Sequence, residues 1–254
     1  MPKKKLITIV TVVLNRVNDI EQTILSVINN GYQNIEYIII DGGSVDGTVE
    51  IIRKYEKEIN YWISENDSGI YSAINKGLTL ASGESIGILN AGDRLISGAL
   101  ESVSRNENLS KIIIYGGLSF VDSNRKQIYS YMPPLTLKKL RKQMIVCHPS
   151  TFIGKEIYNF LGNYDETYQI AADYKLILKA YLQNVRFERT ERILVEFLEG
   201  GISANFKFRN LTENMRLRRE LKISQIVIKE LIIYIYFRVK NIFRLLKKWV
   251  INRK

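Results

Sequence analysis

The sequence lacks the features of a disulfide-bonded, membrane-spanning or low-complexity protein. Its 254 residues contain one cysteine, Cys147, so no internal disulfide can form and a reducing compartment is favoured. No run reaches the roughly 20 apolar residues that a membrane-spanning helix needs. The apolar run 6–14 lacks a small-residue cleavage site, so we interpret it as a buried strand and not as a signal peptide. No internal repeat is present.

The positive charge is confined to the last fifth of the chain. The net charge is +11, and residues 1–206 contain 23 Lys and Arg against 23 Asp and Glu. Residues 207–254 contain 14 Lys and Arg against three acidic residues. This separation predicts a neutral body, residues 1–206, with a basic appendage, residues 207–254, and argues against a uniformly basic nucleic-acid binder.

The first half of the chain alternates between apolar runs and segments with helical periodicity. We expect strands at 6–14, 35–40, 61–64 and 84–89, and helices at 18–30, 47–58, 69–81 and 97–106. A β-α-β-α order predicts a parallel sheet with helices on both faces, whose ligands bind beyond the carboxyl ends of the strands. Polar residues gather at those ends: Asn15, Asp41, 65–67 and 90–93.

The pattern changes after residue 110. The expected elements are a hairpin from 111–121 and 126–131, a short helix near 136–142, a strand at 150–155, a helix at 172–183 and an extended segment at 185–197. Added to the first half, they predict an α/β fold with a mixed, mainly parallel sheet.

Four aspartates follow strands or open helices: Asp41, Asp67, Asp93 and Asp173. Aspartates at such positions can meet two needs of a group-transfer reaction: neutralising a departing phosphate group, and taking the proton of an incoming hydroxyl. Mg²⁺ or Mn²⁺ held by carboxylate oxygens meets the first need, because these cations bind oxygen and bridge phosphates. A separate carboxylate meets the second.

Five motifs, in order and at a familiar spacing, resemble those of family-2 glycosyltransferases over about residues 5–205. The first motif has two parts, VVLN (12–15) and IDGGSVDGT (40–48). The other four are ENDSGIY (65–71), AINKG (73–77), ASG (81–83) and LNAGD (89–93). The resemblance implies a GT-A-type nucleotide-sugar-binding domain, use of Mn²⁺ or Mg²⁺, and a role in building capsule, lipopolysaccharide or another surface glycan.

The resemblance also assigns donor-side residues. It implies that Asp41 contacts the base or ribose of the nucleotide, although a turn acid is the alternative, a role that suits Asp46 better. It places Asp67 on the nucleoside side, and Lys76 near the diphosphate or simply in solvent. Asn15 ends the first strand, where donor contact and strand capping are equally open.

Asp93 is the candidate metal ligand. Similar enzymes carry two acids, as Asp-Asp or Asp-x-Asp, whereas this chain has Ala91-Gly92-Asp93. The retained aspartate is the one that the resemblance implies as the ligand, and a turn role is the alternative. One carboxylate with diphosphate oxygens and water can hold Mg²⁺ or Mn²⁺, so we expect weak metal affinity without the donor.

Asp173 occupies the place of the catalytic base in similar enzymes, and the lead-in 163–166 also matches. The alternative is a helix N-terminal acid stabilised by the helix dipole, and the two roles are compatible. Direct displacement with inversion of the anomeric carbon would follow. His148, the only histidine, is either a structural residue or an acceptor-side residue.

The last segment, 238–254, has an apolar face that includes Phe243 and Trp249, opposite a basic face. Such a helix favours attachment to an anionic membrane surface, although packing on its own domain is the alternative. No Gln-x-x-Arg-Trp element, which is associated with processive synthases, is present. Gly200-Gly201-Ile202-Ser203 resembles a mobile loop that closes over the site.

The sequence therefore predicts a cytoplasmic enzyme, peripheral on the inner membrane face. It would transfer one sugar from a nucleotide-sugar, most simply a UDP-sugar, to a glycan or lipid-linked acceptor. A binding module of the same fold that has lost catalysis is the alternative, suggested by Gly92. Nucleic-acid binding is disfavoured, because no aromatic and basic platform is expected on the sheet.

Overall fold

The computed structural model describes residues 5–200, 207–223 and 232. The chain divides into two compact units, residues 1–199 and 200–254. The first unit is an α/β domain, and the second contains α8 (Lys207–Glu220) within its described part. The expected amphipathic helix 238–254 and most of the glycine loop lie outside the described residues. In the described ranges, no helix combines the length and apolar character needed to cross a membrane.

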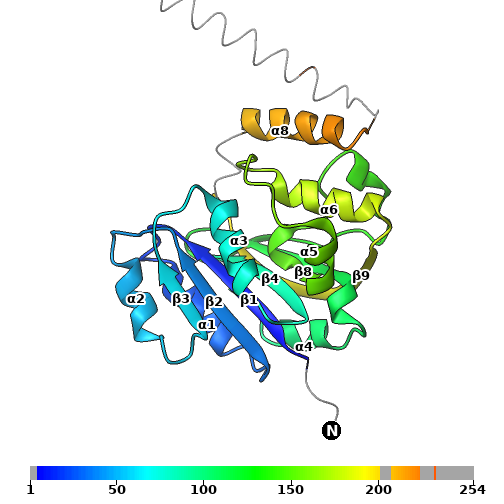
Figure 1. The fold of residues 1–254 in the computed structure, drawn as a ribbon. Helices are drawn as coiled ribbons and strands as arrows, with labels where there is room; N and C mark the ends of the chain where they lie inside the picture. Colours follow the sequence, from blue (N-terminus) through cyan, green and yellow to red (C-terminus); the bar gives the residue numbers. More distant parts are fainter. Residues whose placement is uncertain (1–4, 201–206, 224–231, 233–254) are drawn as a thin grey trace, which may run out of the picture. The chain divides into compact units, whose positions relative to one another are not determined.

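The first unit follows the expected order of strands and helices (Figure 1). Its first part contains β1 (Ile7–Val13), α1 (Ile20–Ile28), β2 (Ile35–Asp41), α2 (Thr48–Lys54), β3 (Tyr61–Ser64), α3 (Ile70–Leu80) and β4 (Ser85–Asn90). Its second part contains β5 (Arg94–Leu95), α4 (Ala99–Ser104), η1 (Leu109–Lys111), β6 (Ile112–Val121), β7 (Gln127–Tyr131), η2 (Leu137–Arg141), η3 (His148–Ser150), β8 (Thr151–Gly154), α5 (Lys155–Leu161), α6 (Ala172–Leu182) and β9 (Arg186–Leu198).

The strands form one mixed sheet in the order β3-β2-β1-β4-β8-β6-β9-β5, with β7 paired to β6. The strands β3, β2, β1 and β4 are mutually parallel, so their carboxyl ends share one edge. The strand β8 runs antiparallel to β4 and to β6, while β9 runs parallel to β6. The expected α/β class with a mixed sheet is confirmed.

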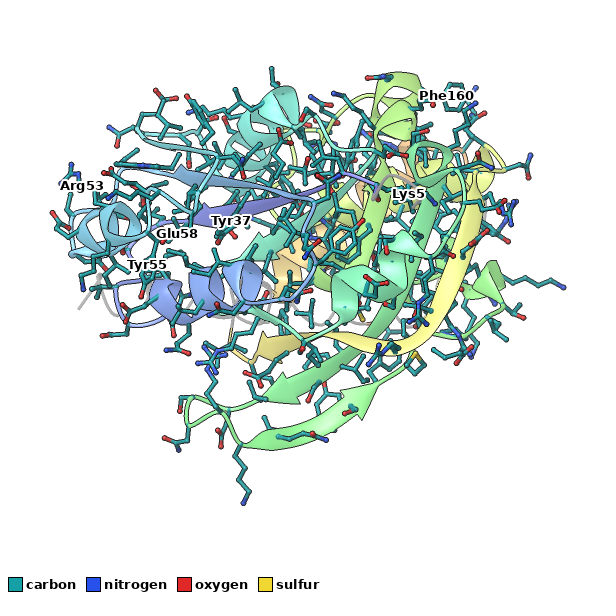
Figure 2. All side chains as sticks on the ribbon, turned by 90° about the horizontal axis from the view of Figure 1, so that it is seen from below. Lys5, Tyr37, Arg53, Tyr55, Glu58 and Phe160 are labelled. Atoms are coloured by element: carbon teal, nitrogen blue, oxygen red, sulfur yellow. The ribbon has the colours of Figure 1, made fainter. Side chains whose placement is uncertain are left out.

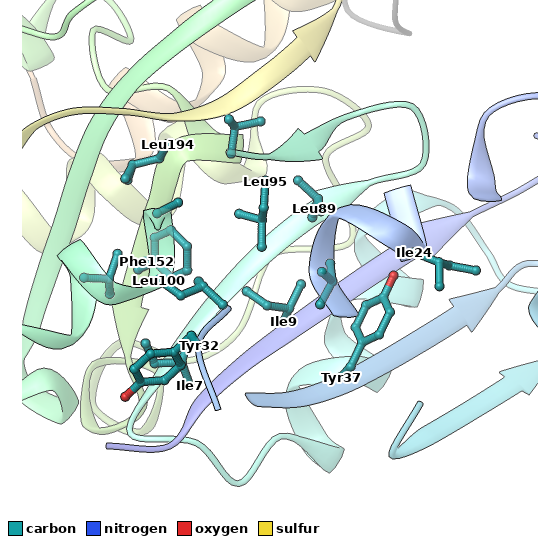
Figure 3. Packing of buried hydrophobic residues seen from close by; sticks show 14 of the residues in the cluster. Ile7, Ile9, Ile24, Tyr32, Tyr37, Leu89, Leu95, Leu100, Phe152 and Leu194 are labelled. Carbon is teal, nitrogen blue, oxygen red and sulfur yellow. The ribbon is translucent and has the colours of Figure 1, made fainter. Parts of the chain in front are cut away.

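The central strands are buried on both faces, which their continuous Ile and Val runs predict. Ile7 and Ile9 point to the face where Ile24 of α1 packs, in the cluster drawn in Figure 3. Val10 points to the other face, where α3 lies so close that a Cβ on Gly77 would sit 2.3 Å from Val10 Cγ1. Only glycine permits this contact, and α3 is therefore fixed tightly on β1.

Two short elements differ from the sequence expectation. The helix α5 begins at Lys155, where we expected a strand to end, and it stops at Gly162, whose φ is +85°. Its buried residues Ile157 and Leu161 lie one turn apart, while Phe160 is 67% exposed at the periphery of the domain (Figure 2). The two-residue strand β5 follows the LNAGD motif and pairs with β9. It is too short to leave a periodic signal.

Candidate active site

Asp41 ends β2 and organises the loop that follows it. Its side chain is completely buried, and Oδ2 accepts hydrogen bonds from the amides of Gly43 (3.1 Å) and Ser44 (2.8 Å) and from Ser64 Oγ (2.6 Å). The Ser44 hydroxyl donates to the other oxygen, Oδ1. The carboxylate thus holds the Gly42–Ser44 loop against β3. Contact with a nucleotide base or ribose, which the resemblance implies, stays a prediction.

Asp67 and Asn66 lie directly against this loop. A Cβ on Gly42 would lie 2.6 Å from Oδ2 of Asp67, and a Cβ on Gly43 would collide with the Asn66 side-chain oxygen. Gly43 also has a φ of +87°, a conformation that favours glycine. The two glycines therefore let the loops after β2 and β3 meet at the carboxyl edge of the sheet.

Asn15 follows β1 and joins the same assembly. Its amide donates to Ser44 Oγ at 2.7 Å, and its side-chain oxygen accepts a 3.0 Å hydrogen bond from the Val45 amide. Both contacts stabilise the loop after β2. Asp46 accepts hydrogen bonds from the amide (3.0 Å) and hydroxyl (2.6 Å) of Thr48, the first residue of α2, as the helix-capping alternative predicts.

Lys76 lies on α3 and forms an ion pair of 2.8 Å with Glu65, which precedes Asp67 in the same motif. The Lys76 side chain is 32% exposed and that of Glu65 is 50% exposed. The ammonium group is thus held near the loop after β3. Whether it reaches a diphosphate there stays a prediction.

Asp93 is a buried carboxylate in the loop between β4 and β5. It is 4% exposed, and its Oδ1 accepts a 3.1 Å hydrogen bond from the amide of Leu198 at the end of β9. Burial raises the pKa of Asp93 to about 7, although the Leu198 amide and the positive charges of Arg125 and Arg16 oppose the rise. The carboxyl group of Asp93 therefore gains or loses its proton near neutral pH.

Gly92 adopts a backbone conformation that restricts this position to glycine. Its φ is +107°, and a Cβ would lie 3.3 Å from Leu198 Cδ2. Its amide donates to Thr23 Oγ1 at 2.9 Å, and its carbonyl accepts from Arg125 Nη1 at 2.8 Å. A second acid at position 92 would therefore have to adopt a backbone conformation that disfavours any side chain.

Arg125 is a residue of this region that the sequence did not indicate. It lies in the turn between β6 and β7, has a φ of +63°, and its guanidinium lies 3.3 Å from Glu196 and 3.9 Å from Asp19. Asp19 also pairs with Arg16 at 3.3 Å. These side chains surround the Asp93 loop with alternating charges. A single arginine in a hairpin turn carries no sequence signal that could have identified it.

Asp173 lies in the first turn of α6, and its Oδ1 is 3.3 Å from the hydroxyl of Tyr71 in α3. The same hydroxyl donates to the carbonyl of Ile170 at 2.5 Å. Tyr71 is the last residue of the ENDSGIY motif, but nothing in the sequence indicated that it contacts Asp173. The contact brings the candidate base beside the start of α3.

His148 lies in the same cluster. Its Nε2 is 2.9 Å from the hydroxyl of Tyr164, whose ring stacks on that of Tyr71 with centroids 5.7 Å apart. Burial lowers the pKa of His148, and the negative charge of Asp173 opposes this. The neutral imidazole is thus a hydrogen-bond partner of Tyr164, and an acceptor-side role for His148 stays a prediction.

The structure places both candidate carboxylates at one edge of the sheet. Asp93 follows the carboxyl end of β4, and Asp173 contacts Tyr71 at the start of α3, which follows the carboxyl end of β3. Across the ranges that the structure describes, no three Asp, Glu, His or Cys side chains form a group that could hold a metal ion. Asp93 as a metal ligand therefore stays a prediction.

Comparisons with known sequences identify the family. The family description "Glycosyl transferase family 2" matches residues 8–158. A Mycobacterium tuberculosis protein named as an uncharacterized glycosyltransferase is 32% identical over 182 residues, which are 69% of each chain. A Mycobacterium bovis glycosyltransferase of PGL/p-HBAD biosynthesis is 22% identical over 205 residues, which cover 77% of this chain and 78% of its own.

Solved structures share the fold. TarS of S. aureus in complex with UDP superposes with a TM-score of 0.66 at 16% identity, over 89% of this chain and 68% of TarS. The mannosyltransferase PcManGT from Pyrobaculum calidifontis, solved with GDP-Man and Mn²⁺, gives a TM-score of 0.61 at 16% identity, over 89% and 66%. The GT-A fold expected from the sequence is thereby confirmed.

Proposed function

Because this chain belongs to glycosyltransferase family 2 and is therefore a sugar transferase, we propose that it moves one sugar from a UDP-sugar to a glycan or lipid-linked acceptor with inversion at the anomeric carbon. The observation that carries this proposal is the position of Asp93 and Asp173 at the same edge of the sheet. In this proposal Asp93 serves the leaving diphosphate, and Asp173 serves the incoming acceptor.

The loops after β2 and β3 support a nucleotide site. Gly42 and Gly43 lack side chains where the chain meets Asn66 and Asp67, so the two loops meet closely at the edge of the sheet where ligands of such folds bind. Asp41 stabilises the loop after β2 through hydrogen bonds, and Lys76 adds a positive charge near the loop after β3. UDP is the proposed nucleotide because the related fold of TarS binds it.

The chemistry of the Asp93 position fits Mn²⁺ or Mg²⁺ held by one protein ligand. Carboxylate oxygen suits these hard cations, and diphosphate oxygens and water would complete the coordination. When bound, the cation would neutralise charge on the diphosphate. The proton held by Asp93 near pH 7 must leave first, so deprotonation and cation binding are linked.

Asp173 acts as the base in the proposed reaction. Its carboxylate takes the proton of the acceptor hydroxyl while that oxygen attacks the anomeric carbon from the side opposite the diphosphate. The bond from carbon to the acceptor oxygen forms as the bond to the diphosphate oxygen breaks, so the anomeric configuration inverts. We propose an acceptor-side role for His148, which contacts Tyr164 and feels the charge of Asp173.

The basic segment 207–254 supports attachment to an anionic membrane surface on the cytoplasmic side, where lipid-linked acceptors of capsule, lipopolysaccharide or related glycans are made. Its 14 Lys and Arg against three acidic residues would be attracted to anionic headgroups. Co-sedimentation of the full chain with vesicles containing phosphatidylglycerol should fall steeply with salt. Equal binding to neutral vesicles would contradict this part of the proposal.

The test of the main proposal is nucleotide release from a panel of nucleotide sugars with Mn²⁺, with and without lipid-linked acceptors. We expect one donor to be consumed, and Asp93→Asn and Asp173→Asn each to reduce turnover by at least about 100-fold. A protein that binds a donor but turns over none of the panel would be a binding module of the same fold instead.

A further inference from the structure

We infer that Tyr71 is a positioning residue that holds the Asp173 carboxylate in place for proton transfer, an inference that rests on the proposed function. The Tyr71 hydroxyl lies 3.3 Å from Asp173 Oδ1 and 2.5 Å from the carbonyl oxygen of Ile170. Ile170 precedes α6 by two residues. One hydroxyl therefore contacts both the candidate base and the backbone that leads into its helix.

The ring of Tyr71 is fixed as firmly as its hydroxyl. It is 7% exposed and stacks on Tyr164, with an angle of 16° between the ring planes. Burial and the nearby charge of Asp173 raise the pKa of Tyr71 well above its ordinary value. The phenol thus stays protonated at neutral pH and remains a hydrogen-bond donor.

Asn75 adds a second anchor one turn further along α3. Its Nδ2 donates to the carbonyl of Tyr164 at 2.9 Å, and its Oδ1 accepts from the amide of Tyr164 at 3.0 Å. Positions 71 and 75 lie on the same face of a helix. The segment before α6 is therefore held by α3 at two points, one of which contacts Asp173.

The same helix also carries the donor side. Asp67 Oδ1 accepts a 2.9 Å hydrogen bond from the amide of Gly69, the residue immediately before α3, and its other oxygen lies beside Gly42. Further along, Gly77 seats α3 against Val10 of β1. The helix α3 therefore contacts both the loop that carries Asp67 and the segment that carries Asp173. The Tyr71 contact thus fixes the position of the proposed base relative to the proposed donor site.

The test compares Tyr71→Phe with the parent protein in Mn²⁺-dependent release of UDP from UDP-N-acetylglucosamine and of GDP from GDP-mannose, with water as the acceptor. The variant keeps the ring and loses the hydroxyl. We expect turnover to fall about tenfold, while the donor Kd, measured by calorimetry, stays within about twofold. A residue that only supported the fold would weaken both together.

A matched control is Tyr37→Phe, which removes another buried hydroxyl, bonded to Thr11 at 3.1 Å in the core. Its turnover should equal that of the parent. In the double variant Tyr71→Phe with Asp173→Asn, turnover should be no lower than with Asp173→Asn alone, because both contacts of the hydroxyl, to Asp173 and to the Ile170 carbonyl, act on turnover by positioning the carboxylate. If Tyr71→Phe does not fold, Asn75→Ala replaces it and should show the same loss of turnover at unchanged donor affinity.

The outcomes separate the two proposals. A parent protein that turns over a donor, with Tyr71→Phe as fast as the parent, would overturn this inference and leave the proposed function standing. Additive losses in the double variant would also overturn it. A parent protein that releases no nucleotide from any donor of the panel would overturn the proposed function and this inference with it.

Discussion

The carboxylate of Asp93 accepts a hydrogen bond from the amide of Leu198, 105 positions later in the chain. This contact joins the LNAGD motif after β4 to the end of β9 in the other half of the domain. It also uses one oxygen of the candidate metal ligand. A cation that binds at Asp93 therefore meets a carboxyl group that is already buried and partly satisfied, and the first predictions concern this competition.

Asp93→Asn should stabilise the protein above neutral pH. Burial raises the pKa of Asp93 from 3.8 to about 7 in the folded state, so the folded protein holds this proton more tightly than the unfolded chain. Stability is lost as pH rises through that window, on the order of a few kcal/mol. The variant escapes this loss. Thermal unfolding without donor or cation should give a higher Tm for Asp93→Asn at pH 8 and a smaller difference at pH 5.

The same variant should lose turnover, so stability and activity should change in opposite directions. Glu58→Gln, a substitution of an exposed residue in the turn after α2 (labelled in Figure 2), provides the control and should leave the Tm unchanged at both pH values. A Tm for Asp93→Asn below that of the parent at pH 8 would contradict the prediction.

Gly92→Asp, which restores the second acid of the motif, should not strengthen cation binding. The φ of +107° and the 3.3 Å approach of Leu198 Cδ2 to the added Cβ make any side chain unfavourable there. We expect a destabilisation of about 1–3 kcal/mol in urea unfolding. Gly92→Ala is the matched control and should lose a similar amount. Tighter Mn²⁺ binding by Gly92→Asp in a calorimetric titration would refute this account.

Mn²⁺ affinity should depend on the nucleotide. One protein carboxylate leaves most coordination positions to other oxygens, and a diphosphate supplies them. Titration of Mn²⁺ followed by electron paramagnetic resonance should show weak binding to the protein alone and at least about tenfold tighter binding with UDP. Uridine, which lacks the diphosphate, should have no effect. Equal Mn²⁺ affinity with and without UDP would point to ligands other than Asp93.

Asp41→Asn should destabilise the domain more than most surface changes do. The buried carboxylate accepts hydrogen bonds from the amides of Gly43 and Ser44 and from two serine hydroxyls. The NH₂ group of an asparagine side chain would face some of these donors and cannot accept their hydrogen bonds. Loss of one or two such hydrogen bonds costs about 2–4 kcal/mol. Urea unfolding gives the value, and UDP binding should weaken in parallel, since the loop after β2 loses its support.

The sequence predicts the first half of the domain, from β1 to β4, well. Strands such as Ile35–Asp41 are continuous apolar runs, and α1 and α3 have clear helical spacing, so local pattern and final structure agree. The motifs also placed Asp41, Asp67 and Asp93 at strand ends, because topology alone brings parallel strand ends to one edge. These elements need no information from distant parts of the chain.

The contacts across the site were not predictable from the sequence. The Tyr71–Asp173 contact joins residues 102 positions apart, and Arg125 reaches Gly92 from a hairpin turn. Neither depends on local periodicity, so only the tertiary structure reveals them. The strand β8 was predicted at 150–155 and lies at Thr151–Gly154, but the helix α5 directly after it was not predicted.

The missing methyl group at Gly77 leaves α3 no clearance above β1. A helix seated in this way cannot tilt without lifting Tyr71 away from Asp173 and Asn75 away from Tyr164. We therefore expect any drift in sugar preference among variants of this chain to arise in the surrounding loops, since a change in the helix would disturb the loop after β3 and the segment before α6 at the same time.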